Sequence, residues 1–191
     1  KLLFPNFEVQ LNIAEAQFKT ANDRAGEAIP LLTEALSRDP ESIQLLYTRA
    51  LAFEKIDKID GAEKDLRRIL ELKPNDPDAL NALGYTLADR TDRYEEALVL
   101  IKAALQQKPE SAAILDSMGW VLLKLGQLEN AVSYFTKAWG ISQDHEIAAH
   151  YGELLWRLGR HKDAREIWRI GYESHPESDK IRRTIERLTN S

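Results

Sequence analysis

The segment His145–His150 holds the two residues whose type most suggests metal chemistry, a pair of histidines on one expected helix. A zinc-protease helix places its histidines four residues apart, so that both side chains share one face. Here the histidines are five residues apart. That spacing turns them about 140° from one another around a helix of 3.6 residues per turn. They cannot both bind one metal from a straight helix, so we expect capping and groove-lining roles, no metal site and no cofactor.

Other catalytic patterns do not occur in the sequence. It contains no glycine-rich dinucleotide or Walker loop and no Gly-x-Ser-x-Gly elbow. Carboxylates are abundant, but on helical faces they are usually solvated surface rather than acid–base pairs. The absence of cysteine excludes disulfides and thiolate metal sites. We therefore predict that the chain is not an enzyme.

The charge balance also limits the partners. With 26 basic and 31 acidic side chains, the chain has a net charge of −5. Binding to nucleic acid or to an anionic membrane surface requires a surplus of Lys and Arg, so we predict no nucleic-acid partner. No apolar run reaches the roughly 20 residues needed to span a bilayer. The chain begins at Lys1 rather than Met, and we expect it to be a processed or excised piece.

Small residues recur at a nearly constant interval along the chain. Where two helices cross closely, only a small side chain fits, and large apolar residues fill the space beside it. Leu32, Leu66, Ile101, Phe135 and Trp168 each follow a recurring alanine by four residues, and we expect them in the core together with Leu36, Trp139 and Tyr172. The alanines are separated by 34, 35, 34 and 33 residues: Ala28, Ala62, Ala97, Ala131 and Ala164.

Helix stop and start residues follow the same interval. Prolines, which lack an N–H and restrict the preceding residue, come twelve residues after four of the alanines. Side chains with an oxygen acceptor then precede each new apolar run, where they can cap free N–H groups. The prolines are Pro40, Pro74, Pro109 and Pro176, and the predicted caps are Ser42, Asp76, Ser111, Asp144 and Ser178.

These landmarks resemble the tetratricopeptide repeat, and the segments 80–85 and 115–120 match its leucine–glycine pattern best. The resemblance implies an all-α, right-handed superhelical solenoid of five helix-turn-helix repeats and a C-terminal capping helix. We predict an N-terminal extension over 1–8, five repeats over 9–178 and the capping helix over 179–191. The repeats are expected at 9–42, 43–76, 77–111, 112–144 and 145–178.

In this family the first helix of each repeat lines a concave groove. An aromatic stripe with a few polar groups could hold an extended peptide or a partner's helix there. The alternative is that these rings pack on neighbouring repeats, or that residues 1–6 of the same or another chain fill the groove. The predicted groove residues are Tyr47, Leu51, Asn81, Tyr85, Asp116, Trp120, Leu123, His150, Glu153 and Trp156.

The strings 115–120 and 146–158 are similar to the C-terminal repeats of proteobacterial outer-membrane tetratricopeptide lipoproteins. That resemblance implies a periplasmic adaptor of a carboxy-terminal processing protease, which presents substrates such as cell-wall hydrolases. It also implies a lipid anchor and further repeats upstream of Lys1. Other possibilities are a pilus or secretin assembly scaffold, a cytosolic co-chaperone, and a self-assembly module that forms homo-oligomers. The lysines of the usual chaperone-tail clamp do not occur at the first-helix positions.

Overall fold

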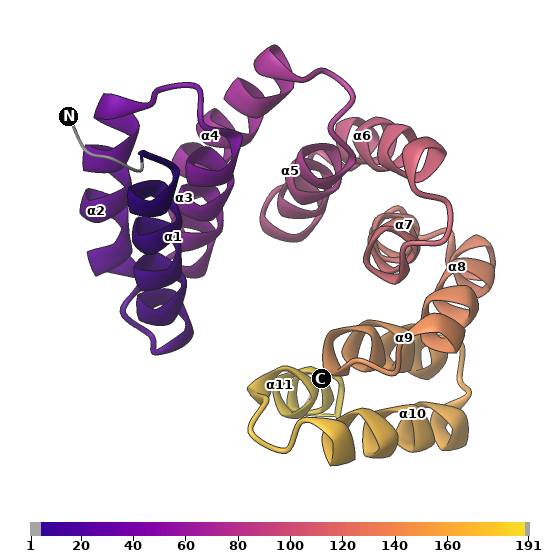
Figure 1. The fold of residues 1–191 in the computed structure, drawn as a ribbon. Coiled ribbons are helices and arrows are strands. Elements are labelled where there is room, and N and C mark those ends of the chain that lie inside the picture. Colours follow the sequence, from indigo (N-terminus) through magenta and orange to yellow (C-terminus); the bar gives the residue numbers. More distant parts are fainter. Residues whose placement is uncertain (1–4, 190–191) are drawn as a thin grey trace. The chain divides into compact units, whose positions relative to one another are not determined.

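The computed structural model describes the backbone of residues 5–189 and the side chains of residues 7–189. Within this range the regular structure is entirely α-helical, which confirms the predicted all-α class. None of these helices is both long and apolar enough to cross a membrane. The helices, labelled in Figure 1, are α1 (Pro5–Ala21), α2 (Ala25–Arg38), α3 (Ile43–Lys55), α4 (Ile59–Leu72), α5 (Pro77–Arg90), α6 (Tyr94–Gln107), α7 (Ala112–Lys124), α8 (Leu128–Ile141), α9 (His145–Arg157), α10 (His161–Ser174) and α11 (Asp179–Thr189).

The chain forms two compact units, which are described separately: residues 1–86 and residues 87–191. The boundary falls within α5. In the first unit, α1 packs on α2 and α3 packs on α4, and α2 and α1 both contact α3. In the second unit, α7 packs on α8 and α9 on α10, while α9 also contacts α7 and α11. Each unit is therefore built from helical hairpins whose first helices touch one another, as tetratricopeptide stacking requires.

Small residues occur where paired helices cross, as predicted. The five recurring alanines are at most 1% exposed, and the large residues that follow them by four positions are at most 2% exposed. A Cβ atom added to Gly119 would lie 2.8 Å from the Phe135 ring. At Gly152 an added Cβ would lie 2.0 Å from Trp168 Nε1. The ring of the second helix thus occupies the volume that a side chain on the first helix would need.

The predicted stop and start residues mostly take the expected positions. Each of the four prolines lies two residues beyond the end of a second helix. Asp76 Oδ1 accepts hydrogen bonds from the backbone N–H groups of Asp78 and Ala79, at 3.1 and 3.0 Å. Asp144, Ser111 and Ser178 also accept a bond from the following helix. Ser42 is the exception, because its side chain makes no capping hydrogen bond.

The turns inside the hairpins share one backbone feature. Asp23, Asp57, Gly126 and Gly159 all have positive φ, between 57° and 75°. This left-handed conformation ends the first helix and reverses the chain, and glycine adopts it without steric cost. The Thr91–Arg93 turn of the third repeat contains a different local contact, in which the Arg93 N–H donates to the Thr91 hydroxyl at 3.1 Å.

Two expectations about the ends of the repeats can be compared with the structure. Helix α1 already begins at Pro5, within the stretch predicted as an extension, while the repeat boundaries remain a prediction. Tyr172, predicted to be a core residue, is 49% exposed, whereas Leu36 and Trp168 are buried and Trp139 is partly buried. The prediction for Tyr172 was wrong because α11 is a single helix, which covers less of α10 than a full hairpin would.

Candidate protein-binding surfaces

An open groove of about 430 Å³ lies on the first helices of the first unit. Its walls come from α1, α3 and the start of α5, which are the elements that the repeat pattern assigns to the binding side. Most of its lining side chains are polar, so a ligand would meet hydrogen-bonding groups as well as apolar surface. The lining residues are Gln10, Ile13, Gln17, Ile43, Gln44, Tyr47, Thr48, Asp76 and Asp78.

Tyr47 is the predicted site residue that lines this groove. Its side chain is half-buried, and burial raises the pKa of its phenol, with the charges of Asp78, Glu54 and Asp76 raising it further. Burial also acts on Asp76, but the Lys73 ammonium, 2.9 Å away, and two backbone N–H groups hold the pKa of its carboxyl below the ordinary value. One edge of the groove is therefore acidic and ionised at neutral pH.

The other predicted residues of the first unit lie on the same helices. Leu51 on α3 is 41% exposed, and Asn81 and Tyr85 on α5 are half-buried. Asn81 Oδ1 is buried and accepts no hydrogen bond from the described residues. An unpaired buried acceptor costs about 1–3 kcal/mol, and a donor from a binding partner would recover that cost.

In the second unit the corresponding residues bind one another. Asp116 Oδ2 lies 2.8 Å from His150 Nδ1, and both side chains are buried. The His150 ring stacks on Trp120 with centroids 4.2 Å apart, and the Lys124 ammonium lies 5.0 Å from the Trp120 ring. Trp120 is only 6% exposed. The Trp120 side chain therefore packs on a neighbouring repeat, which was the alternative to a groove-lining role. Its Nε1 has no hydrogen-bond partner among the described residues.

Glu153 forms a second contact between first helices. Its carboxylate is 1% exposed and binds Arg157 at 2.6 Å and Arg187 of α11. Burial raises the pKa of Glu153, but the two guanidinium groups outweigh this effect and leave the pKa below its ordinary value. The buried charge is therefore ionised at neutral pH, and it ties the last helix to α9.

Two predicted groove residues of the second unit lie elsewhere. Leu123 is 1% exposed, which places it in the core and leaves it no groove surface. Trp156 stacks on His161 at 4.1 Å and contacts Trp168 at 5.7 Å, so it faces α10 of its own hairpin. Both residues lie near the end of a first helix. There the repeat pattern did not distinguish side chains that face the groove from side chains that face the second helix of the same hairpin.

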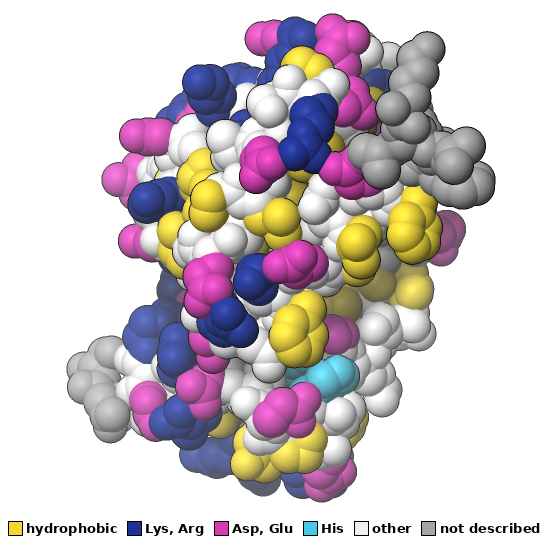
Figure 2. Space-filling view, turned by 60° about the vertical axis from the view of Figure 1, so that its left-hand side comes forward, with side chains coloured by type: hydrophobic (Ala, Val, Ile, Leu, Met, Phe, Trp, Pro, Cys, Tyr) yellow, Lys and Arg dark blue, Asp and Glu magenta, His cyan; other side chains and the backbone are white. Residues whose placement is uncertain are grey.

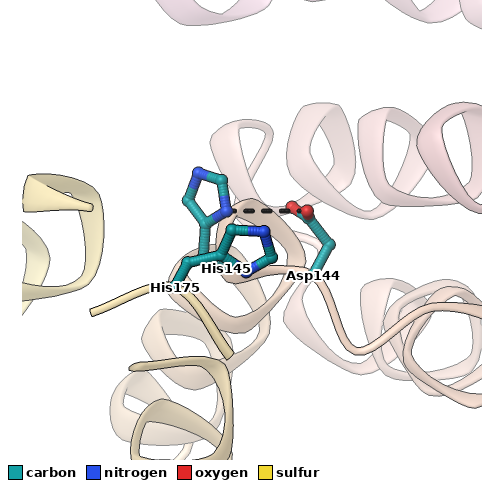
Figure 3. Close-up of side chains that lie close together, drawn as sticks. All are labelled: Asp144, His145 and His175. Carbon is teal, nitrogen blue, oxygen red and sulfur yellow. Dashed lines mark ion pairs between the residues drawn. The ribbon is translucent and has the colours of Figure 1, made fainter. Parts of the chain in front are cut away.

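The two histidines considered for a metal lie in separate surroundings. His150 contacts Asp116, whereas His145 lies with Asp144 and His175 (Figure 3). The prediction that His145 and His150 do not share one site agrees with this placement. His175 was not considered, because it is 30 residues away in sequence and follows α10.

The sequence reasoning missed a set of pairs that join first helices of successive hairpins, or the last first helix, α9, to the capping helix α11. Each pair is joined by a side-chain hydrogen bond and separated by 34 residues, which equals the repeat length. We call these the one-repeat pairs. They could have been found by asking which polar residues recur one repeat apart with matching donors and acceptors. They are Gln10–Gln44, Asp116–His150, Glu146–Lys180 and Glu153–Arg187.

Charges of opposite sign are mixed over the surface. On the face in Figure 2, Lys and Arg side chains lie among Asp and Glu side chains. Arg169, for example, binds Glu166 at 2.7 Å and Glu173 at 2.6 Å.

A second groove, of about 420 Å³ and largely apolar, lies between α10 and α11 and includes Tyr172. The suggestion that residues 1–6 fill a groove concerns side chains outside the described part of the chain.

Helical hairpins with small residues at their crossings define a helical-repeat protein. Family models described as tetratricopeptide repeat match residues 19–84 and 112–145, together more than half of the chain. The chain belongs to the tetratricopeptide-repeat family, and the predicted repeat solenoid is its fold class.

Two groups of known proteins are similar to it. The TPR repeat-containing protein PA4667 of Pseudomonas aeruginosa is 46% identical over 98% of this chain, which spans about a third (32%) of that relative. Among solved structures, a thermophilic tetratricopeptide protein of Thermus thermophilus superposes with a TM-score of 0.82 at 22% identity, over 95% of this chain and 99% of the other. PilF of Pseudomonas aeruginosa gives 0.73 at 20% identity, over 98% and 94%. At these identities the structures show a common fold alone.

Proposed function

We propose that the chain is a non-catalytic scaffold that binds a partner protein through the groove of its first unit. The observation that carries this proposal is the open groove on α1, α3 and the start of α5, which is lined mainly by polar residues and also exposes apolar surface. Tetratricopeptide repeats generally mediate protein–protein interactions, and this groove lies on the helices that such proteins use. An extended segment fits its chemistry, because glutamine and threonine side chains can pair with peptide N–H and C=O groups.

The charge of the groove indicates what the segment should carry. Asp76, which also binds Lys73, and Asp78 stand on one edge. Their negative charges would attract a Lys or Arg of the partner placed there. Tyr47 offers a half-buried ring with a hydroxyl, the type of residue that most often dominates binding energy. The proposed ligand is therefore an extended protein segment with a basic residue near the start of α5.

The finer proposal concerns the partner. We infer that it is a carboxy-terminal processing protease, or the cell-wall hydrolases presented to it, and that the full protein is held at the periplasmic side of the outer membrane by an N-terminal lipid. The support is the resemblance of segments 115–120 and 146–158 to adaptor lipoproteins of that kind. Pilus or secretin assembly is the second candidate, because the fold also superposes on PilF.

A direct binding experiment tests both levels of the proposal. The purified chain, a Tyr47→Ala variant and a Tyr94→Ala variant are used to capture proteins from a proteobacterial envelope extract. Tyr94 is a half-buried tyrosine on the second helix α6 and is not part of the lining of either groove described above, so it provides the matched control. We expect the native chain and Tyr94→Ala to retain the protease or its substrates, and Tyr47→Ala to lose about 2 kcal/mol of binding energy.

Each other outcome has a distinct meaning. Equal retention by all three proteins would move the contact away from the groove. Recovery of a secretin in place of the protease would favour the assembly scaffold. Recovery of further copies of the chain alone would favour self-assembly. Melting temperatures of the three proteins, measured in parallel, separate lost binding from lost folding.

A further inference from the structure

Three side chains with metal-binding atoms meet at the start of α9. Asp144 is the N-cap of that helix, His145 is its first residue, and His175 follows the end of α10 (Figure 3). One donor atom from each lies within 4.8 Å of the other two, and all three side chains are partly buried. The two imidazole rings have centroids 4.5 Å apart at an angle of 44°. Two sequence-distant segments therefore bring two nitrogens and a carboxylate oxygen to one point.

The hydrogen bonds around His175 determine which of its nitrogens is free. The Ser174 hydroxyl has one proton, and it lies 2.9 Å from the Gly171 carbonyl oxygen, to which it donates. Ser174 Oγ lies 3.1 Å from His175 Nδ1 and can accept a hydrogen bond from that nitrogen in the Nδ1–H tautomer. In the neutral ring this leaves the lone pair on Nε2. A ligand histidine that donates its other N–H to a protein oxygen is the usual arrangement at metal sites.

Asp144 and His145 are prepared in a similar way. Asp144 Oδ1 accepts the Glu146 N–H at 2.8 Å, which fixes the carboxylate and leaves Oδ2 available. His145 Nδ1 is buried and has no hydrogen-bond partner among the described residues. It lies 3.5 Å from Asp144 Oδ2, beyond the usual length of a hydrogen bond. A buried nitrogen without a partner is costly, and a cation between the two groups would satisfy both.

We propose that Asp144, His145 and His175 form a binding site for a divalent transition-metal ion, with Zn²⁺ as the best match. Two imidazole nitrogens and one carboxylate oxygen are ligands that zinc accepts, and a tetrahedral ion keeps its fourth position for water. Ligand atoms around tetrahedral zinc lie about 3.4 Å apart, given bond lengths of about 2.0–2.2 Å. His145 Nδ1 and Asp144 Oδ2, which are 3.5 Å apart, already have about that spacing, and the donor atoms of all three groups lie within 4.8 Å of one another.

The bound ion would join the start of α9 to the segment between α10 and α11. It would therefore stabilise the α9–α10 hairpin by joining its two open ends. This role is separate from partner binding in the first unit, because all three ligands belong to the second unit.

Titration of the full, tag-free chain with ZnCl₂ in metal-free buffer tests the site. Calorimetry should show one ion per chain, and Co²⁺ should give the visible absorption of a tetrahedral complex. His145→Asn, His175→Asn and Asp144→Asn should each weaken Zn²⁺ binding more than about tenfold. Asn at position 144 retains the helix cap, so loss of binding there reports the lost charge. His161→Asn, a histidine outside the cluster, is the matched control and should change the affinity less than about twofold.

A thermal scan supplies an independent readout. Zn²⁺ should raise the melting temperature of the native chain and of His161→Asn, because a ligand that binds only the folded state stabilises it. It should leave that of His175→Asn unchanged, and since His175 lies outside the helices, this variant is expected to fold. The proposal is overturned if Zn²⁺ shows no saturable binding, or if the cluster variants bind it as tightly as the native chain. Equal weakening by His161→Asn would also overturn it, because it would assign the binding to another histidine.

Discussion

The first helices of the two units use the same repeat pattern with different results. In residues 1–86 they border an open groove whose polar side chains remain partly accessible, with Tyr47 in its wall. In residues 87–191 the equivalent faces are closed by contacts such as Asp116–His150, and Trp120 is buried. The difference shows that the repeat does not by itself decide whether a first-helix residue binds a partner or a neighbouring hairpin. A matching residue one repeat further along does not decide it alone, because Gln10 and Gln44 also pair one repeat apart and still line the open groove. The two faces differ in the burial of the paired side chains, since Asp116 and His150 are both buried.

The largest effect that tests this comparison is expected from Trp120→Ala. The substitution removes a 6%-exposed ring stacked on His150, and we expect a loss of about 3 kcal/mol in unfolding free energy. Tyr47→Ala in the open groove should cost clearly less stability. Chemical denaturation of both variants measures the contrast. Equal losses would mean that the two faces are closed to the same degree.

The next effect concerns the helix crossing in the second unit. Gly152→Ala would place a Cβ 2.0 Å from Trp168 Nε1, and the buried ring has to move. We expect a loss of about 2–3 kcal/mol from overpacking. Gly140→Ala is the control, since nothing lies within 4 Å of an added Cβ there and alanine favours a helix. If both variants melt at the native temperature, the crossing is looser than described.

A charge substitution tests the link between α9 and α11. Glu153→Gln removes the buried charge that binds Arg157 and Arg187, and we expect a loss of about 2 kcal/mol at neutral pH, since the arginines are half-exposed. The folded-state pKa of Glu153 lies below its unfolded value of 4.5. Its contribution is therefore complete above about pH 4.5 and is lost as the pH falls through the folded pKa. Unfolding curves from pH 7 to 3 should show a smaller acid-induced loss for the variant; parallel curves would contradict the pairing.

The smallest effect distinguishes the turns of the two units. Gly159 and Asp57 occupy equivalent turns with φ of 75° and 60°. Gly159→Ala should cost about 1 kcal/mol, because alanine is strained in the left-handed region. Gly159→Asp should cost less, since Asp tolerates this conformation locally. Thermal melts of both variants measure which substitution lowers the melting temperature more. A larger loss for Gly159→Asp than for Gly159→Ala would mean that backbone strain does not explain the glycine at this position.

The sequence allowed the helices and their crossings to be predicted, because size and backbone chemistry act locally there. Proline beyond a helix and Asp76 as a cap each follow from one residue and its immediate neighbours. The alanines at the crossings follow from their recurrence at about one repeat length. The groove was predicted less well. Whether Trp120 faces solvent depends on His150, and the exposure of Tyr172 depends on how much of α10 the last helix covers.

The metal-ligand cluster is the extreme case of that dependence. His175 lies 30 residues from His145, a spacing that is not the repeat length. The pattern on a single helix face does not place the two rings together. Their proximity results from the antiparallel pairing of α9 and α10, which brings the start of α9 beside the end of α10.

The one-repeat pairs have a consequence for engineering. A chain cut or recombined between hairpins keeps one member of each pair that spans the cut and loses the other. Removal of α11, for instance, would leave Glu153 with Arg157 but without Arg187, and Glu146 without Lys180. A hairpin transplanted from a relative is therefore an incomplete module unless the donor supplies matching side chains on both flanks. The natural unit of exchange is a hairpin together with the first helix that follows it.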